Sequence, residues 1–158
     1  MPENNTSADN TNTLLEVIHL TKYFPIEAGF LRKQIGAVKA VDDVSFYINE
    51  GETFGLVGES GCGKTTLGRC IVRAIDCTSG AIFLKLDTGE TLDLSTMTNK
   101  ELREVRKHFH MIFQDPYGSL DPRMTILDIV GEPIRNNNLA TGEEVIEMVK
   151  SLLNDVGL

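Results

Sequence analysis

The sequence predicts an α/β fold in which a glycine-rich loop joins a strand to a helix. Three observations predict this arrangement. The string Gly58–Thr65 (GESGCGKT) matches the pattern G-x-x-x-x-G-K-[ST] at each of its fixed positions. The preceding run Thr53–Val57 is short and mostly apolar, as a buried strand is. The following run Thr65–Ile75 carries apolar residues at helical spacing, namely Leu67, Ile71, Ala74 and Ile75.

The residues of this loop are those of a phosphate-binding site. Glycine lacks a Cβ, so Gly58, Gly61 and Gly63 let the backbone turn tightly and come close to a ligand. The loop amides and the N-terminus of the next helix then attract an anion. We expect Lys64 to reach the β- and γ-phosphates of a nucleoside triphosphate, and the Thr65 hydroxyl to ligate Mg²⁺. The alternative is a glycine-rich turn that binds nothing, which the eight matched positions and correct flanks disfavour.

The composition narrows the classes of protein. The chain has 158 residues, 41% of them hydrophobic, which suggests one domain with a core. Its net charge of −8 argues against a protein that follows a nucleic-acid backbone. The three cysteines form no C-x-x-C pair, and no secretory signal or run of about 18–20 apolar residues occurs, so we expect reduced thiols and a soluble protein.

Before the loop we expect a leader and two strands. Residues 1–13 are polar and are predicted to be disordered. A first strand covers Leu14–Leu20, and Pro25 is expected to stop its pairing, so that residues 25–36 form a surface loop. A second strand covers Ala37–Asn49, near whose end apolar and polar residues alternate.

After the loop helix the chain alternates between strands and short helices. A strand is predicted from Ala81 to Leu86, with a hairpin turn at Asp87–Glu90 that leads to Leu92 and Leu94. Thr98 and Glu101 form a capping box, which predicts a helix from about Asn99 to Lys107.

Three further elements are predicted in the last fifty residues. Phe109–Phe113 is apolar and predicts a strand. Thr125–Val130 predicts a helix that stops before Pro133. Thr141–Glu144 matches a second capping box and predicts a helix that Gly157 terminates.

Three strings, together with the loop, resemble one family. They are LTKYFP at 20–25, VKAVDDVSFYINEGETFGLVGESGCGKTTLGR at 38–69 and MIFQDPYGSLDPRMTI at 111–126. They resemble the ATP-binding subunits of ATP-binding-cassette (ABC) transporters, most closely those of the oligopeptide/dipeptide importer group, and the resemblance covers residues 14–158. It implies an α/β fold with a P-loop NTPase core, an N-terminal antiparallel β subdomain and, from about 115 to 158, the start of a helical subdomain.

The resemblance also implies the roles of particular residues. An aromatic side chain, Phe24 or its neighbour Tyr23, corresponds to the ring that stacks on adenine. Gln114 corresponds to the Q-loop glutamine, which contacts Mg²⁺ and the attacking water, so that Lys64 and Gln114 are the implied catalytic residues and Thr65 and Gln114 the implied metal ligands. The implied triphosphate site comprises Gly58, Glu59, Ser60, Gly61, Cys62, Gly63, Lys64, Thr65 and Thr66.

The implied function is that of an ATPase subunit that couples ATP binding and hydrolysis to the transport of peptides across a membrane. Its cofactors are ATP and Mg²⁺, and its partners are membrane-spanning permease subunits and a second ATP-binding subunit, identical or not; no nucleic acid is involved. The subunit is cytoplasmic and lies on the inner face of the membrane through the permease. The cargo stays open among oligopeptide, dipeptide and metal. The alternatives are a truncated, non-catalytic nucleotide-binding remnant and a soluble ABC ATPase.

Two family motifs do not occur in the 158 residues: an LSGGQ-like signature and the four apolar residues with Asp-Glu of Walker B. In the family both follow the position of Leu158, so the sequence resembles the N-terminal portion of a longer, C-terminally truncated subunit. The expectation is that this chain alone binds ATP at most, with negligible turnover. The Walker B strand lies beside the loop strand in the family, so Thr53–Val57 is expected to expose an apolar edge.

Overall fold

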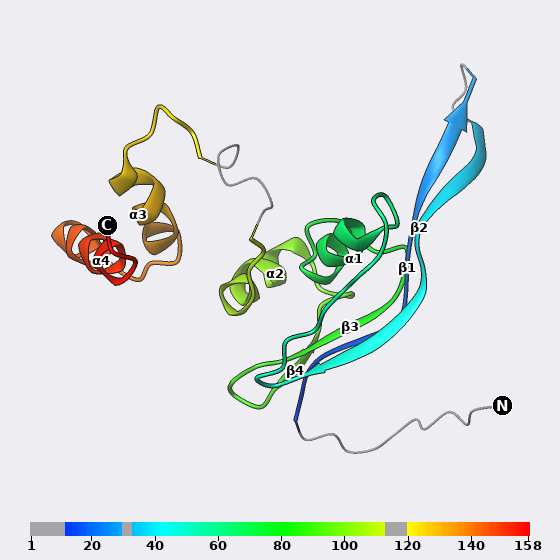
Figure 1. The fold of residues 1–158 in the computed structure, drawn as a ribbon, viewed down its shortest axis with the longest axis horizontal. Helices are drawn as coiled ribbons and strands as arrows, with labels where there is room; N and C mark the ends of the chain where they lie inside the picture. Colours follow the sequence, from blue (N-terminus) through cyan, green and yellow to red (C-terminus); the bar gives the residue numbers. More distant parts are fainter. Residues whose placement is uncertain (1–11, 30–32, 113–119) are drawn as a thin grey trace. The chain divides into compact units, whose positions relative to one another are not determined.

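The computed structural model describes residues 12–29, 33–112 and 120–158 (Figure 1). The chain divides into two compact units, Met1–His110 and Met111–Leu158. The predicted leader lies outside the described residues up to position 11, and its last residue, Thr13, already begins the first strand.

The first unit contains a four-stranded antiparallel sheet in the order β2-β1-β3-β4. Figure 1 shows β1 and β2 as a long twisted hairpin, with β3 and β4 beside it. The strands are β1 (Thr13–Ala28), β2 (Lys33–Asn49), β3 (Ser79–Lys85) and β4 (Thr91–Asp93). The predicted antiparallel β subdomain is therefore confirmed, as is the turn at 87–90, where Gly89 has φ +84°.

The predicted end of the first strand at Pro25 is wrong. β1 continues to Ala28 and pairs with Lys33–Ala37, so most of the predicted surface loop is strand. β3 accompanies β1 only as far as Thr21, and beyond that residue β1 has β2 on one side only. An edge strand tolerates a proline whose nitrogen faces away from its partner, since no ladder hydrogen bond is lost there.

Helix α1 (Lys64–Ile71) supplies the helical side of the core. It ends four residues before the predicted Ile75, because Arg73 adopts a left-handed backbone with φ +50°. The Arg73 side chain bonds Asp76 and the Met97 carbonyl. The core unites α1 with the sheet and with α2, and its buried residues are Val17, Leu20, Val41, Leu67, Cys70, Ile82, Leu84, Leu94 and Leu102.

The predicted strand Thr53–Val57 is not a strand of this structure. Among the described residues no strand pairs with it, and a strand needs a neighbour to satisfy its backbone groups. Its apolar side chains are exposed, as expected for an unpaired edge: Phe54 by 43%, Leu56 by 46% and Val57 by 95%. The ring of Phe54 stacks on Phe46 of β2, with ring centroids 4.8 Å apart.

The capping box of the next helix is confirmed. Thr98 Oγ1 accepts from the Glu101 N–H at 3.4 Å, and Glu101 Oε2 accepts from the Thr98 N–H at 2.7 Å. The helix α2 (Asn99–Val105) continues as the 3₁₀-helix η1 (Arg106–His108). The strand predicted at Phe109–Phe113 is wrong for residues 109–112, which pair with no strand of the described chain; Phe113 lies outside the described residues.

The second unit contains two helices, α3 (Ile126–Asn136) and α4 (Glu143–Asp155), which pack through Ile134, Val145 and Val149. Contrary to prediction, α3 continues through Pro133, because the packing of Ile134 outweighs one missing backbone hydrogen bond.

The second predicted capping box is wrong, because Gly142 is the N-cap of α4 and no side chain caps it. Gly157 has φ +79° and terminates α4 as predicted. No helix in the described part of the chain is both long and apolar enough to cross a membrane.

Candidate functional site

The glycine-rich loop has a backbone that favours glycine at two positions. Gly61 has φ +82° and Gly63 has φ +98°, both in the region that L side chains rarely adopt. Gly63 is also the N-cap of α1, so the helix begins directly at Lys64. The first amide groups of α1 have no partner within the helix and can meet an anion held by the loop.

Two glycines of the loop lie close to other atoms, and at Gly63 the neighbouring atom is backbone. A Cβ on Gly63 would lie 2.0 Å from the carbonyl oxygen of Ala40 in β2, and one on Gly58 would lie 2.7 Å from Cys62 Sγ. Because the Ala40 oxygen is backbone, it cannot move aside as a flexible side chain can. The loop is therefore seated directly on β2.

Lys64 is the cation of the loop. Its Nζ donates to the carbonyl oxygens of Gly58 at 2.7 Å and Glu59 at 2.6 Å, and lies 3.5 Å from Cys62 Sγ. The ammonium therefore lies over the start of the loop, within reach of any anion that the loop amides hold. Thr65 is exposed and Thr66 half-buried in the first turn of α1.

A cavity of about 380 Å³, called here the loop pocket, adjoins this loop. Its walls come from β2, from the segment before the loop, from the loop and from α1. They are formed by Lys39, Ala40, Val41, Asp42, Val44, Leu56, Val57, Cys62, Gly63, Lys64 and Leu67. Lys39 and Asp42 on β2 thus face the same cavity as Lys64.

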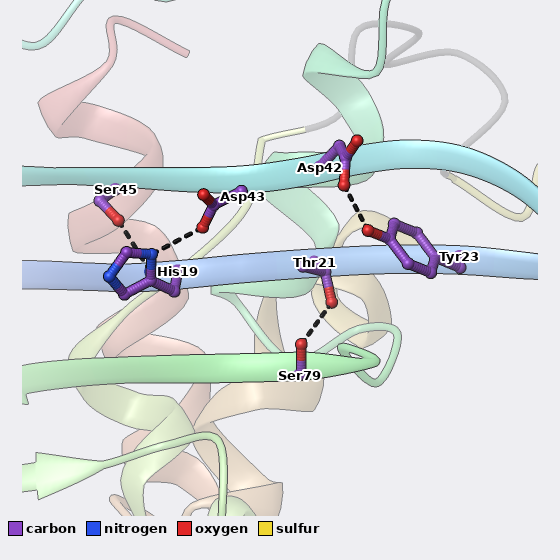
Figure 2. Close-up of polar contacts among 7 residues, drawn as sticks. All are labelled: His19, Thr21, Tyr23, Asp42, Asp43, Ser45 and Ser79. Atoms are coloured by element: carbon purple, nitrogen blue, oxygen red, sulfur yellow. Dashed lines mark hydrogen bonds and ion pairs between the residues drawn. The ribbon is translucent and has the colours of Figure 1, made fainter.

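Tyr23, Lys39 and Asp42 form a polar cluster, called here the Tyr23 network. Figure 2 shows the Tyr23 hydroxyl and the Asp42 carboxylate pointing toward each other, and the hydroxyl donates to Asp42 Oδ1. Lys39 Nζ donates to Asp42 Oδ2 at 3.1 Å and lies 5.2 Å from the centroid of the Tyr23 ring. The Tyr23 hydrogen bond and then Lys39 lower the pKa of Asp42, while the bond to Asp42 raises the pKa of Tyr23 and that of Lys39.

Other polar contacts fasten β1 to its neighbours on either side (Figure 2). His19 Nδ1 lies 2.6 Å from Asp43 Oδ1, and the His19 N–H donates to Ser45 Oγ at 2.8 Å. Thr21 Oγ1 lies 2.7 Å from Ser79 Oγ of β3. His19 and Asp43 have positive φ values of 47° and 54° beside shifts in the β1–β2 register, so these bonds hold an irregular part of the hairpin.

The structure brings some predicted site residues together and leaves others apart. Gly63, Lys64 and Cys62 share the loop pocket, and Tyr23 touches two other residues of its wall. Phe24 is 41% exposed and does not line this pocket; the centroid of its ring lies 4.9 Å from Lys22 Nζ. Gln114 lies outside the described residues.

Sequence reasoning missed Lys39 and Asp42. Both stand in the string VKAVDD, but their contact with Tyr23 depends on the strand register, which pairs Tyr23 with Lys39.

The residues of the loop fit a phosphate group and its metal ion. Gly63 lets the loop approach the backbone of β2, Gly58 leaves room for Cys62 Sγ within the loop, and Lys64 supplies the charge. Within the described ranges, no group of three or more His, Cys, Asp or Glu side chains could hold a metal ion. Mg²⁺ bound through a Thr65 hydroxyl and phosphate oxygens needs no such group.

The antiparallel sheet, the glycine-rich loop seated on it and the lysine at the start of α1 together define a phosphate-loop protein. Residues 41–158 match the sequence model of the ABC transporter family. The chain belongs to that family.

Curated relatives cover nearly all of this chain but are much longer. This chain is 46% identical over 153 residues to "Oligopeptide transport ATP-binding protein AppF" of Bacillus subtilis. The aligned region covers 96% of this chain and 45% of that protein. It is 43% identical to "Probable peptide ABC transporter ATP-binding protein y4tS" of Sinorhizobium fredii, over 94% of this chain and 40% of that protein. The chain is 41% identical to "Glutathione import ATP-binding protein GsiA" of Escherichia coli K12, over 92% of this chain and 22% of that protein. The chain thus spans less than half the length of these relatives.

Solved structures confirm the fold class. The ATP-binding cassette MJ0796, described as a dimer in a post-hydrolysis state bound to ADP and Pi, superposes with a TM-score of 0.69 at 22% identity. The match covers 89% of this chain and 56% of MJ0796. The described residues therefore have the α/β fold of part of an ABC cassette.

Proposed function

We propose that this chain is part of the ATP-binding subunit of an ABC importer for peptides, and that it binds MgATP at the loop of residues 58–66. The names of its relatives support the class of cargo, since AppF and OppF are oligopeptide transport proteins and GsiA is a glutathione import protein. These names span peptides of several lengths, so the proposal extends to peptides as a class.

One observation carries the binding site: the Lys64 ammonium lies over the start of a glycine loop that leads directly into the N-terminus of α1. An anion bound in this loop supplies oxygens that accept hydrogen bonds from Lys64 Nζ, in place of the Gly58 and Glu59 carbonyl oxygens. The loop amides and the N-terminus of α1 then share its charge. Thr65, exposed at that N-terminus, is the proposed ligand of Mg²⁺, together with Gln114.

Between the two aromatic candidates for the adenine, the geometry favours Tyr23. Adjacent residues of a strand point to opposite faces, and Tyr23 is the one that contacts Lys39 and Asp42 of the loop-pocket wall. Phe24 contacts Lys22 instead. We therefore assign the stacking ring to Tyr23.

The proposed partners are permease subunits and a second ATP-binding subunit, on the inner face of the membrane. Dimeric structures of the cassette MJ0796 support the second of these partners. The coupling of ATP hydrolysis to transport belongs to that assembly.

Calorimetric titration of the protein with MgATP tests the site. Lys64→Ala is expected to lower the affinity by about 10- to 100-fold or more, because the charged hydrogen bonds to phosphate are lost. Lys100→Ala is the matched control, since it removes an exposed lysine from α2, remote in sequence from the loop. Equal affinity of Lys64→Ala and wild type would overturn the assignment.

A further inference from the structure

We propose that Asp42 and Lys39 are positioning residues that hold the Tyr23 ring as a preset platform for the base of the nucleotide. This inference rests on the proposed function and adds to it two residues that contact the ring rather than the phosphates. It is carried by the register of the β1–β2 hairpin, by the seat of the loop on β2 and by the contacts of the Tyr23 network.

The register explains how Lys39 and Asp42 reach the same ring. Residues three apart in a regular strand point to opposite faces. Here Lys22 pairs with Val41 but Tyr23 pairs with Lys39, so Ala40 is an extra residue on β2, as in a β-bulge. Together with a second register shift between Leu20 and Lys22, across from Asp42, this bulge lets Lys39 and Asp42 turn to one side, where Lys39 Nζ and Asp42 Oδ2 are 3.1 Å apart.

The same bulge seats the phosphate loop. The carbonyl oxygen of Ala40 is the atom that a Cβ on Gly63 would meet at 2.0 Å. The extra residue of the bulge beside Lys39 is therefore also the one on which the loop rests. A base platform and a phosphate loop that share one backbone element keep a fixed separation, which a nucleotide of fixed length requires.

Two contacts of the network restrain the Tyr23 ring, and a third contact, with Thr78, restrains its backbone. The hydroxyl of Tyr23 donates to Asp42, the ammonium of Lys39 lies 5.2 Å from the ring centroid, and the Tyr23 backbone N–H donates to Thr78 Oγ1 at 2.9 Å. A ring that is already fixed loses little conformational entropy when a base stacks on it, whereas a free ring must first be ordered. The gain is therefore preorganisation, and it acts only on ligands that have a base.

The test compares MgATP with inorganic tripolyphosphate, which has the phosphates but no base. Asp42→Asn keeps the shape of the side chain, and Tyr23→Phe keeps the ring while removing its hydroxyl. Each is expected to weaken MgATP binding about three- to tenfold and not to weaken tripolyphosphate binding. The double variant is expected to be no weaker than either single variant, because the hydroxyl and the carboxylate act as one unit. Tyr23→Leu, which removes the ring, is expected to lose about 10- to 100-fold.

A spectroscopic readout follows the network itself. The tyrosinate absorbance of wild type minus that of Tyr23→Phe isolates Tyr23 from the other two tyrosines. Because the phenol donates to a carboxylate, its pKa is raised, and Asp42→Asn is expected to lower the titration midpoint.

The outcomes separate this inference from the proposed function. If Lys64→Ala abolishes binding but Asp42→Asn binds MgATP as wild type does, only the inference is overturned. Equal losses of MgATP and tripolyphosphate in Asp42→Asn also overturn it, since the network then supports the fold rather than the base. If wild type binds neither ligand, the proposed function fails and the inference with it.

Discussion

The segments on the two sides of the phosphate loop differ sharply in how they are held. Residues 53–57, before the loop, pair with no strand of the described chain and expose Val57 by 95%. Residues 64–71, after it, form α1 and bury Leu67 and Cys70 to 5% and 0% exposure. Residues 53–57 (TFGLV) are the more apolar of the two and residues 64–71 (KTTLGRCI) the more polar, so hydrophobicity alone does not set which segment is buried.

The difference shows that the loop is anchored from one side. α1 places Leu67 and Cys70 in the core of the sheet, and the carbonyl oxygen of Ala40 in β2 lies against Gly63. The segment before the loop contributes Phe54, which stacks on Phe46, and the rim residues Leu56 and Val57 of the loop pocket. Substitutions on the anchored side should therefore cost stability that equivalent substitutions before the loop do not.

The largest effect is expected from Gly63→Ala. The new Cβ would meet the Ala40 oxygen at 2.0 Å, and alanine is strained at φ +98°. We expect a loss of roughly 3–5 kcal/mol in the free energy of unfolding, together with loss of MgATP binding. Gly68→Ala is the control within α1: no atom lies within 4 Å of its Cβ, so it should stabilise the helix by about 0.5–1 kcal/mol. Denaturant titration of both variants measures the difference, and similar stabilities would show that β2 does not support the loop.

A smaller effect is expected from Leu67→Ala. Truncating this buried side chain removes packing from the core of the sheet, so we expect a loss of about 2–4 kcal/mol. Val57→Ala makes the same kind of apolar truncation before the loop, where the side chain is exposed, and should change stability by less than about 0.5 kcal/mol. Comparable losses in the two variants would contradict one-sided anchoring.

The sequence predicted best where local chemistry decides the structure. The strand after α1, the turn at Gly89 and the capping box of Thr98 and Glu101 all depend on residues within a few positions of one another, and all were confirmed. Predictions failed where a distant partner decides. Pro25 does not end β1 because β2 returns alongside it, and α3 passes through Pro133 because Ile134 packs on α4.

The candidate site divides in the same way. The glycines and Lys64 were recognisable because their order in the chain is the motif. Lys39 and Asp42 were not, since their contact with Tyr23 depends on an irregular β1–β2 register, with an extra residue at Ala40 and a second shift beside Asp42. A strand pattern read with a strict period of two places Lys39 and Asp42 on opposite faces. Bulges that re-aim side chains are therefore where sequence reasoning about a site is weakest.

The smallest effect, about tenfold in a labelling rate, concerns the two cysteines that lie within and after the loop. Cys62 is exposed, whereas Cys70 is buried in α1, where burial raises its thiol pKa. Alkylation needs an accessible thiolate, so Cys62 should react at least about tenfold faster than Cys70, which must wait for local opening. Mass spectrometry of digests after timed labelling resolves the two sites. In Leu67→Ala the rate at Cys70 should rise, because α1 loses packing, while that at Cys62 stays the same, because Cys62 is exposed already. A rise at both sites would contradict this prediction, since it would mean that the packing of α1 also limits the access of reagent to Cys62.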